Sequence, residues 1–113
     1  MKKIGILGST GSVGSQALEV IRNNSDKFEV VFITANSNAK LLLEQAKKFK
    51  PKYVCINNKN KKDCLIESLR KTEVLFGKEG ILELCGNNEV DLILNSIVGY
   101  HGLGPTLKII DSG

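Results

Sequence analysis

The sequence contains no tryptophan, one histidine, one methionine and two prolines among its 113 residues. It has three cysteines, and none of them forms a C-x-x-C pair, so neither a disulfide framework nor a zinc site is indicated. Cys55 lies in the apolar run YVCI and is predicted to be a buried, reduced thiol, which fits the cytosol. No apolar run has the length of a membrane span, and no signal peptide follows Met1. These absences predict a cytoplasmic protein without a membrane partner.

The charge balance is mildly basic. There are 16 lysines and arginines against 12 acidic residues, and the net charge of +4 suits an anionic ligand without requiring one. Lysines gather in the stretches 47–52 and 59–62, but no run of aromatic residues alternates with them. We interpret both stretches as solvated surfaces and expect no nucleic-acid partner. A hydrophobic content of 42% is adequate for one core, so we expect a single domain over residues 1–113.

Strand-like and helix-like stretches alternate along the chain. Apolar, β-branched runs predict strands at 3–7, 28–35, 53–56 and 72–76, and a fifth within 91–99 together with the loop that follows it. Helical spacing, caps and prolines predict helices at 15–23, 39–50, 61–70, 78–86 and 105–110. This order predicts an α/β fold, a Rossmann-like doubly wound parallel sheet in three αβα layers. Ligands of such sheets bind at the carboxyl ends of the strands, which here are the loops 8–14, 34–38 and 95–104.

The stretch GSTGSVG, residues 8–14, connects the first predicted strand to the first predicted helix. Glycine permits a sharp turn there, a side chain at Gly11 would obstruct a diphosphate, and Gly14 would let the helix pack on the strand. The N–H groups and the dipole of the first helical turn favour a negative charge. Three hydroxyl side chains of the loop are predicted donors to phosphate oxygens: Ser9, Thr10 and Ser12. The context favours a dinucleotide-binding loop over a simple turn, and no Gly-Lys-Ser/Thr follows to make a Walker loop.

The end of the second predicted strand favours NADP over NAD. Sites that prefer NAD usually place an acidic residue there to hold the ribose 2′-hydroxyl. The stretch 34–38 reads Thr-Ala-Asn-Ser-Asn and has no acidic residue that would repel a 2′-phosphate. Its amides and hydroxyl can donate to that phosphate, although Asn38 is also well placed to cap the next helix.

Three stretches together resemble the 1-deoxy-D-xylulose 5-phosphate reductoisomerases: GSTGSVG, ITANSNAKLLLEQAKKFKPKYVCI and NSIVGYHGLGPTLKII. The resemblance covers all 113 residues, and the segment Asn95–Thr106 is not a general feature of dinucleotide-binding folds. It implies an NADPH-dependent oxidoreductase of non-mevalonate isoprenoid biosynthesis. Such an enzyme converts 1-deoxy-D-xylulose 5-phosphate to 2-C-methyl-D-erythritol 4-phosphate, and this chain corresponds to its amino-terminal, NADPH-binding part.

The resemblance implies cofactor-binding roles for particular residues of this chain. Around the cofactor diphosphate it implies the glycine loop, namely Gly8, Ser9, Thr10, Gly11, Ser12 and Val13. At the adenosine ribose and its 2′-phosphate it implies Asn36, Ser37 and Asn38. Near the nicotinamide ribose and under the nicotinamide half it implies Asn95, Ser96, Ile97, Val98 and Gly99. No catalytic residue is assigned within the chain.

Two positions depart from the family pattern. The family commonly reads Gly-Lys-Asn where this chain reads Asn36-Ser37-Asn38, so a charge partner for the 2′-phosphate is missing unless Lys40 substitutes for it. The family commonly has two small residues where this chain has Tyr100-His101. We interpret His101 as a turn residue, because histidine acts as a general acid only beside a positioned substrate and partner.

Other parts of the family pattern lie beyond residue 113. They are an N-K-E segment, an acidic site for a divalent metal such as Mg or Mn, a phosphate-binding flap and a helical carboxyl-terminal region. The metal would polarise the oxygens of the sugar-phosphate substrate. None of its ligands can be assigned in this chain. The resemblance implies a full-length homodimer, and we expect the chain alone to bind NADPH without turning over substrate.

Two alternatives stay open on the sequence. One is the NADP-binding domain of another dehydrogenase with a G-x-x-G-x-x-G loop. A short-chain dehydrogenase would need a Tyr-x-x-x-Lys pair, and neither Tyr53 nor Tyr100 is followed by lysine four positions later. The nucleophilic cysteine of an aspartate-semialdehyde-type dehydrogenase would lie beyond a chain of this length. The other alternative is a nucleotide-binding module without enzymatic activity, which the fold by itself does not exclude.

We expect calorimetric titration of the purified chain to show at least a tenfold preference for NADPH over NADH, which corresponds to about 1.4 kcal/mol. The physical reason is that the 34–38 loop offers donors and no carboxylate to the 2′-phosphate. Equal affinity for the two cofactors would contradict this interpretation of the loop.

Overall fold

The computed structural model describes residues 2–95 and 108–111. Its elements follow in the order β1 (Lys2–Leu7), α1 (Ser12–Arg22), β2 (Phe28–Ala35), α2 (Ala39–Phe49), β3 (Tyr53–Ile56), the 3₁₀ turn η1 (Lys59–Lys61), α3 (Lys62–Ser68), β4 (Glu73–Phe76), α4 (Gly77–Cys85), β5 (Leu92–Asn95) and β6 (Lys108–Asp111). The strand–helix alternation predicted from the sequence is therefore confirmed from residue 2 to residue 95.

The strands form one sheet in the order β4-β3-β2-β1-β5-β6. All pairs from β4 to β5 are parallel, which confirms the predicted doubly wound α/β fold. The chain begins in the middle of the sheet, extends outward through β2, β3 and β4, and returns to the other side of β1 with β5. The direction of winding reverses beside β1, and ligands of open sheets bind at such a switch point. The loop that follows β1 therefore lies at the expected binding edge.

The prediction of a helix at 105–110 is wrong for residues 108–110, the part of it that the structure describes. Residues Lys108–Asp111 form β6, which runs antiparallel to β5 with Leu92 opposite Asp111 and Asn95 opposite Lys108. Two adjacent β-branched residues, Ile109 and Ile110, favour a strand over a helix. Without β6, the edge of β5 would present unpaired N–H and C=O groups, which natural sheets avoid. Residues 105–107 lie outside the described part of the chain.

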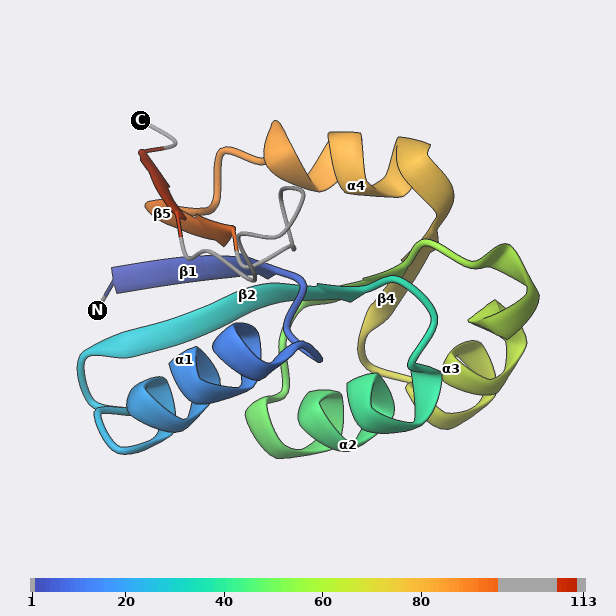
Figure 1. Ribbon diagram of the computed structural model, residues 1–113, viewed down its shortest axis with the longest axis horizontal. Coiled ribbons are helices and arrows are strands. Elements are labelled where there is room, and N and C mark those ends of the chain that lie inside the picture. Colours follow the sequence, from blue (N-terminus) through green and yellow to red (C-terminus); the bar gives the residue numbers. More distant parts are fainter. Residues whose placement is uncertain (1, 96–107, 112–113) are drawn as a thin grey trace.

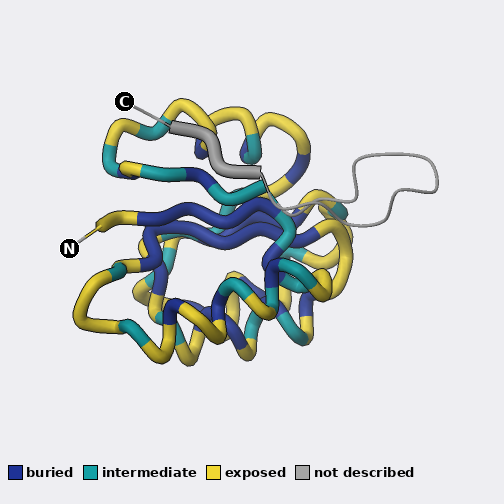
Figure 2. Tube along the Cα trace, turned by 60° about the vertical axis from the view of Figure 1, so that its left-hand side comes forward, coloured by how far each residue is buried: buried dark blue, intermediate teal, exposed yellow. Residues whose placement is uncertain are grey.

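The helices cover both faces of the sheet. Figure 1 shows α1, α2 and α3 below it and α4 above it. Two apolar clusters fill the two spaces between the layers. The larger one joins Ile4, Ile6 and Ile33 to Leu18 of α1 and Leu42 of α2. The smaller one lies beneath α4 and includes Leu7, Val31, Phe32, Leu84 and Ile93. In Figure 2 the central strands accordingly form the buried layer of the molecule.

A β-bulge in β2 sends two consecutive side chains to the same side of the sheet. Ile4 pairs with Val30, but the next residue, Gly5, pairs with Phe32, so Val31 is the extra residue. Val31 and Phe32 both enter the cluster beneath α4. The ring of Phe32 then lies across Gly5, where an added Cβ would be only 2.1 Å from Cε2 of that ring. Gly5 is therefore required by close packing within the core.

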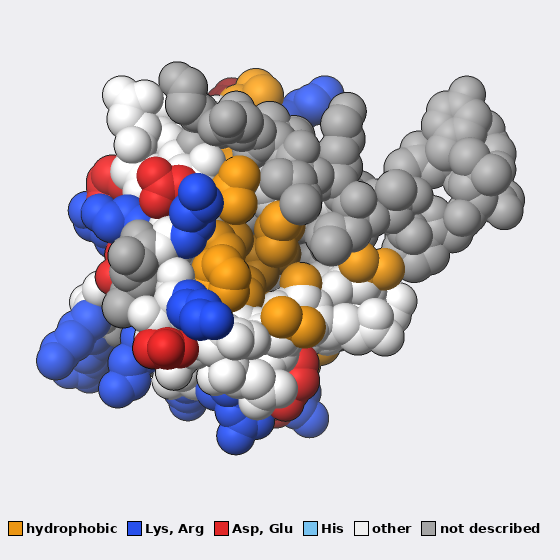
Figure 3. All heavy atoms as spheres, turned by 90° about the vertical axis from the view of Figure 1, so that its left-hand side faces the viewer, with side chains coloured by type: hydrophobic (Ala, Val, Ile, Leu, Met, Phe, Trp, Pro, Cys, Tyr) orange, Lys and Arg blue, Asp and Glu red, His pale blue; other side chains and the backbone are white. Residues whose placement is uncertain are grey.

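Charged side chains of both signs share the surface. On the face shown in Figure 3, lysine and arginine side chains lie among acidic ones and beside apolar atoms. The ion pair between Lys52 and Glu89 has a structural role, because Lys52 Nζ lies 2.5 Å from Glu89 Oε2 and the Tyr53 hydroxyl donates to Glu89 Oε1 at 3.0 Å. These contacts join the start of β3 to the segment before β5. The hydrogen bond from Lys52 lowers the pKa of Glu89 below its usual value.

Replacing Gly5 with alanine is expected to lower the free energy of unfolding by about 1–3 kcal/mol, because the buried Phe32 ring must shift. The matched control is Gly86→Ala at the end of α4. There φ is −92° and the nearest atom to an added Cβ is 3.8 Å away. The control should change stability by less than about 1 kcal/mol. Urea denaturation of both variants measures the difference, and equal losses would contradict the packing argument.

Candidate dinucleotide-binding site

The loop from Gly8 to Gly11 turns the chain from β1 into α1. Gly8 has a φ of +80°, a conformation that glycine adopts without steric cost. The Gly11 N–H donates to the Gly8 carbonyl oxygen at 3.2 Å and closes the turn. Helix α1 begins at Ser12, three residues before the start predicted from apolar spacing. The sequence thus predicted the turn correctly but missed that the helix begins within the glycine motif.

Thr34, the penultimate residue of β2, fixes the start of this loop. Its hydroxyl oxygen accepts a hydrogen bond from the Gly8 N–H at 2.9 Å, and its carbonyl oxygen accepts one from the Ser9 N–H at 2.8 Å. Thr34 is buried, with 2% of its surface exposed. These two hydrogen bonds hold the glycine loop against the end of the neighbouring strand.

Ser9 is a structural residue. Its side chain is fully buried, and its hydroxyl lies 2.7 Å from Gln45 Oε1 of α2 and 3.2 Å from the Thr34 carbonyl oxygen. Gln45 Nε2 donates in return to the Ser9 carbonyl oxygen at 2.8 Å. The hydroxyl and the N–H of Ser9 both have partners inside the protein. The prediction that the Ser9 hydroxyl donates to a phosphate is therefore wrong.

The first turn of α1 presents backbone donors at the end of this loop. An α-helix leaves its first N–H groups without acceptors of its own, and here these belong to Ser12, Val13 and Gly14. The N-cap residue is Gly11, which has no side chain to accept from them. Gly14, the third residue of α1, is buried. The exposed start of α1 is thus electrically suited to an anion.

Gly11 is not required by the fold. Its φ of −74° and ψ of 171° are open to any residue, and an added Cβ would meet only the Gly8 carbonyl oxygen at 3.6 Å. That is an ordinary van der Waals distance. The absence of a side chain at Gly11 therefore leaves free space beside the donors, which is what the close approach of a diphosphate requires.

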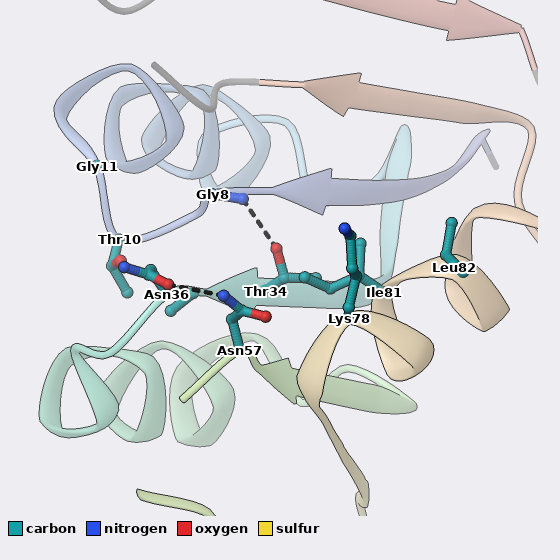
Figure 4. A pocket seen from close by; sticks show the side chains of 10 residues that line it. Gly8, Thr10, Gly11, Thr34, Asn36, Asn57, Lys78, Ile81 and Leu82 are labelled. Atoms are coloured by element: carbon teal, nitrogen blue, oxygen red, sulfur yellow. Dashed lines mark hydrogen bonds between the residues drawn. The ribbon is translucent and has the colours of Figure 1, made fainter. Parts of the chain in front are cut away.

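A pocket of about 790 Å³ opens beside the loop at the carboxyl edge of the sheet. Figure 4 shows side chains from four segments around it. They are Gly8, Thr10 and Gly11 of the glycine loop; Thr34, Ala35 and Asn36 at the end of β2; Asn57 after β3; and Lys78, Ile81 and Leu82 of α4. The pocket therefore extends from the β1–α1 loop across β2 and β3 to α4.

The predicted residues 36–38 take different positions. Asn36 lines the pocket, and its Oδ1 accepts a hydrogen bond from Asn57 Nδ2 at 3.0 Å. Asn38 caps α2, since its Oδ1 accepts from the Leu41 N–H at 3.2 Å, and the capping prediction is confirmed. Ser37 is exposed between them and does not line the pocket. The structure thus brings only Asn36 of this trio to the pocket wall.

Four pocket residues were missed by the sequence analysis. Asn57 follows β3 directly and could have been found by the rule that selected the loops after β1 and β2. Lys78, Ile81 and Leu82 come from α4, the helix on the face of the sheet opposite α1 and α2 (Figure 1). No motif marks these helix residues. Only the packing of α4 over the strands places them opposite the glycine loop.

The predicted nicotinamide side lies mostly outside the described residues. Asn95 ends β5 and pairs with Leu7, the last residue of β1, which places it next to the glycine loop. The other residues predicted there, Ser96, Ile97, Val98 and Gly99, lie outside the described part of the chain, as do Tyr100 and His101.

Comparison with known proteins identifies the family. The family model of 1-deoxy-D-xylulose 5-phosphate reductoisomerase matches residues 4–113. The chain belongs to this family. A curated reductoisomerase from Thermodesulfovibrio yellowstonii is 47% identical over all 113 residues of the chain, which spans 30% of that relative's length. The match favours the reductoisomerase family over both alternatives left open by the sequence.

Solved reductoisomerases share the fold of this family member. The Zymomonas mobilis enzyme in complex with NADPH superposes with a TM-score of 0.81 at 30% identity, covering 87% of this chain and 26% of that one. A reductoisomerase with fosmidomycin and magnesium gives a TM-score of 0.82 at 30% identity and covers 88% of this chain and 25% of that one. This reductoisomerase-family chain therefore spans about a third or less of the length of the relatives it matches.

Cys55 of this family member is a core residue. Burial, together with the nearby Cys85, raises the pKa of the Cys55 thiol to about 12, so Cys55 is a protonated core residue, as predicted.

Among the described residues, no group of three or more histidine, cysteine, aspartate and glutamate side chains could hold a metal ion. None of the helices in that part of the chain is long and apolar enough to cross a membrane.

Replacing Ser9 with alanine should lower the free energy of unfolding by about 1–3 kcal/mol, because it leaves Gln45 Oε1 buried without a donor. The neighbouring variant Thr10→Ala is the control, since Thr10 faces the pocket and should change stability by less than about 0.5 kcal/mol. Thermal unfolding of the two variants compares them. Similar melting temperatures would show that the Ser9–Gln45 contact contributes little.

Proposed function

We propose that this chain is the NADPH-binding part of a reductoisomerase that converts 1-deoxy-D-xylulose 5-phosphate to 2-C-methyl-D-erythritol 4-phosphate. The observation that carries the proposal is the loop around Gly11. Backbone donors of α1 meet an open space there that the fold itself does not need. The family match and the NADPH bound to the Zymomonas mobilis enzyme support the same assignment.

The described residues fit the cofactor. The N–H groups of Ser12 and Val13 would donate to the diphosphate, and the bare Gly11 would let it approach the backbone. Thr10 lines the pocket and would add its hydroxyl, whereas Ser9 supports the loop from inside. The adenosine would extend from the loop toward Asn36 at the end of β2. Ser37 and Asn38 would support that side without entering the pocket.

NADPH would supply a hydride to the reaction, and the role of this chain is to bind and orient the cofactor. We assign the nicotinamide half to the segment 95–99, because Asn95 lies beside the end of β1 on the opposite side of the loop from β2. The sugar-phosphate substrate, a divalent metal such as Mg or Mn and a homodimeric assembly belong to the proposal for the whole enzyme. Solved relatives bind magnesium and fosmidomycin.

The decisive experiment is Gly11→Ala. We expect NADPH affinity to fall at least about tenfold, since a Cβ would occupy the space of the diphosphate. Stability should stay within about 0.5 kcal/mol of the wild type because the site is exposed and its backbone angles suit alanine. Isothermal titration measures the affinity, and urea denaturation measures the stability.

The remote variant Gly86→Ala is the control and should bind NADPH as the wild type does, because Gly86 lies outside the pocket. The proposal fails if the wild-type chain does not bind NADPH. It also fails if Gly11→Ala binds NADPH with unchanged affinity.

A further inference from the structure

Lys78 is the one charged residue among the described residues that line the pocket. It is the second residue of α4 and is exposed. Ile81 and Leu82 follow it at i+3 and i+4, so the three side chains share one face of the helix, and this face lines the pocket. A lysine therefore lines the pocket beside an apolar wall formed by the same helix.

The charge of Lys78 is not neutralised within the described part of the chain. The ion pairs described there are Arg22–Glu19 and Lys52–Glu89, and neither includes Lys78. Its helical neighbours at i+3 and i+4 are apolar and cannot pair with it. A lysine in this position is available to a bound anion.

A second lysine adds positive charge at the same corner. The side chain of Lys59 crosses the start of α4, and its Nζ lies 3.8 Å from the position that a Cβ on Gly77 would occupy. Gly77 immediately precedes Lys78 in α4. The Lys59 ammonium group therefore lies near the start of the helix that carries Lys78, and its positive charge adds to the attraction of an anion to this part of the surface.

Two elements around the pocket suit anionic groups. The start of α1 suits a diphosphate, and Lys78 of α4 lines the same pocket together with Asn36 and Asn57. In NADPH the anionic group beyond the diphosphate is the 2′-phosphate on the adenosine ribose. The 36–38 loop contributes amides and a hydroxyl but no cation. Lys40, the substitute expected from the sequence, is not among the lining residues.

We propose that Lys78 binds the 2′-phosphate of NADPH and is a principal determinant of the preference for NADP over NAD, an inference that rests on the proposed function. Ile81 and Leu82 form the apolar wall against which the adenine ring packs. The positive charge that favours NADP over NAD thus belongs to α4, and not to the loop after β2 that binds the adenosine ribose in most dinucleotide-binding folds.

The test compares two ligands that differ in this phosphate alone. Adenosine 2′,5′-bisphosphate and adenosine 5′-monophosphate are titrated calorimetrically at low ionic strength, where exposed charges are least screened. We expect Lys78→Gln to weaken the bisphosphate about tenfold and the monophosphate less than about twofold. Lys78→Arg should retain most of the discrimination because the charge is kept. The exposed Lys47→Gln, on α2 outside the pocket, controls for net charge.

Each result decides a different point. If the wild type prefers the bisphosphate and Lys78→Gln keeps that preference, Lys78 does not bind the 2′-phosphate. If Lys78→Gln weakens both ligands equally, Lys78 supports the pocket as a whole, and the inference is wrong. If Lys40→Gln removes the discrimination instead, the role belongs to Lys40. If the wild type binds neither nucleotide nor NADPH, the proposed function fails and the inference fails with it.

Discussion

The site depends on the hydrogen bonds between Thr34 and the first two residues of the glycine loop. The threonine hydroxyl and carbonyl oxygens accept from the Gly8 and Ser9 N–H groups, which extends the pairing of β1 and β2 beyond the end of β1. Because Thr34 is buried in the sheet, this contact fixes the direction in which the chain leaves β1. The position of Gly11 and the start of α1 follow from it.

The second layer of support comes from α2. Gln45 exchanges two hydrogen bonds with Ser9, so a helix far along the chain holds the underside of the loop. Among the described residues, no buried side-chain nitrogen or oxygen lacks a hydrogen-bond partner. A satisfied polar pair of this kind is rigid, because breaking either bond would leave a buried group unpaired. The loop that presents these donors is therefore anchored by hydrogen bonds from within the protein.

Donors and charge come from different elements around the pocket. The start of α1 offers neutral N–H groups next to an open glycine, whereas Lys78 of α4 offers a full positive charge. Asn36 and Asn57, which are hydrogen-bonded to each other, also line the pocket. Such an arrangement fits a ligand that carries more than one anionic group.

The sequence by itself determined the order of elements, the parallel sheet and the position of the phosphate loop. These follow from local signals, namely apolar runs, helix caps and a glycine motif whose backbone demands are set within a few residues. It also determined the family, because three motifs occur in order across the whole chain. It failed where one segment depends on a distant one. Ile109 and Ile110 become a strand because β5 offers an edge, and Ser9 faces inward because Gln45 lies beneath it. Only the tertiary structure placed Lys78 at the pocket, because no sequence motif around Lys78 indicates how α4 packs over the sheet.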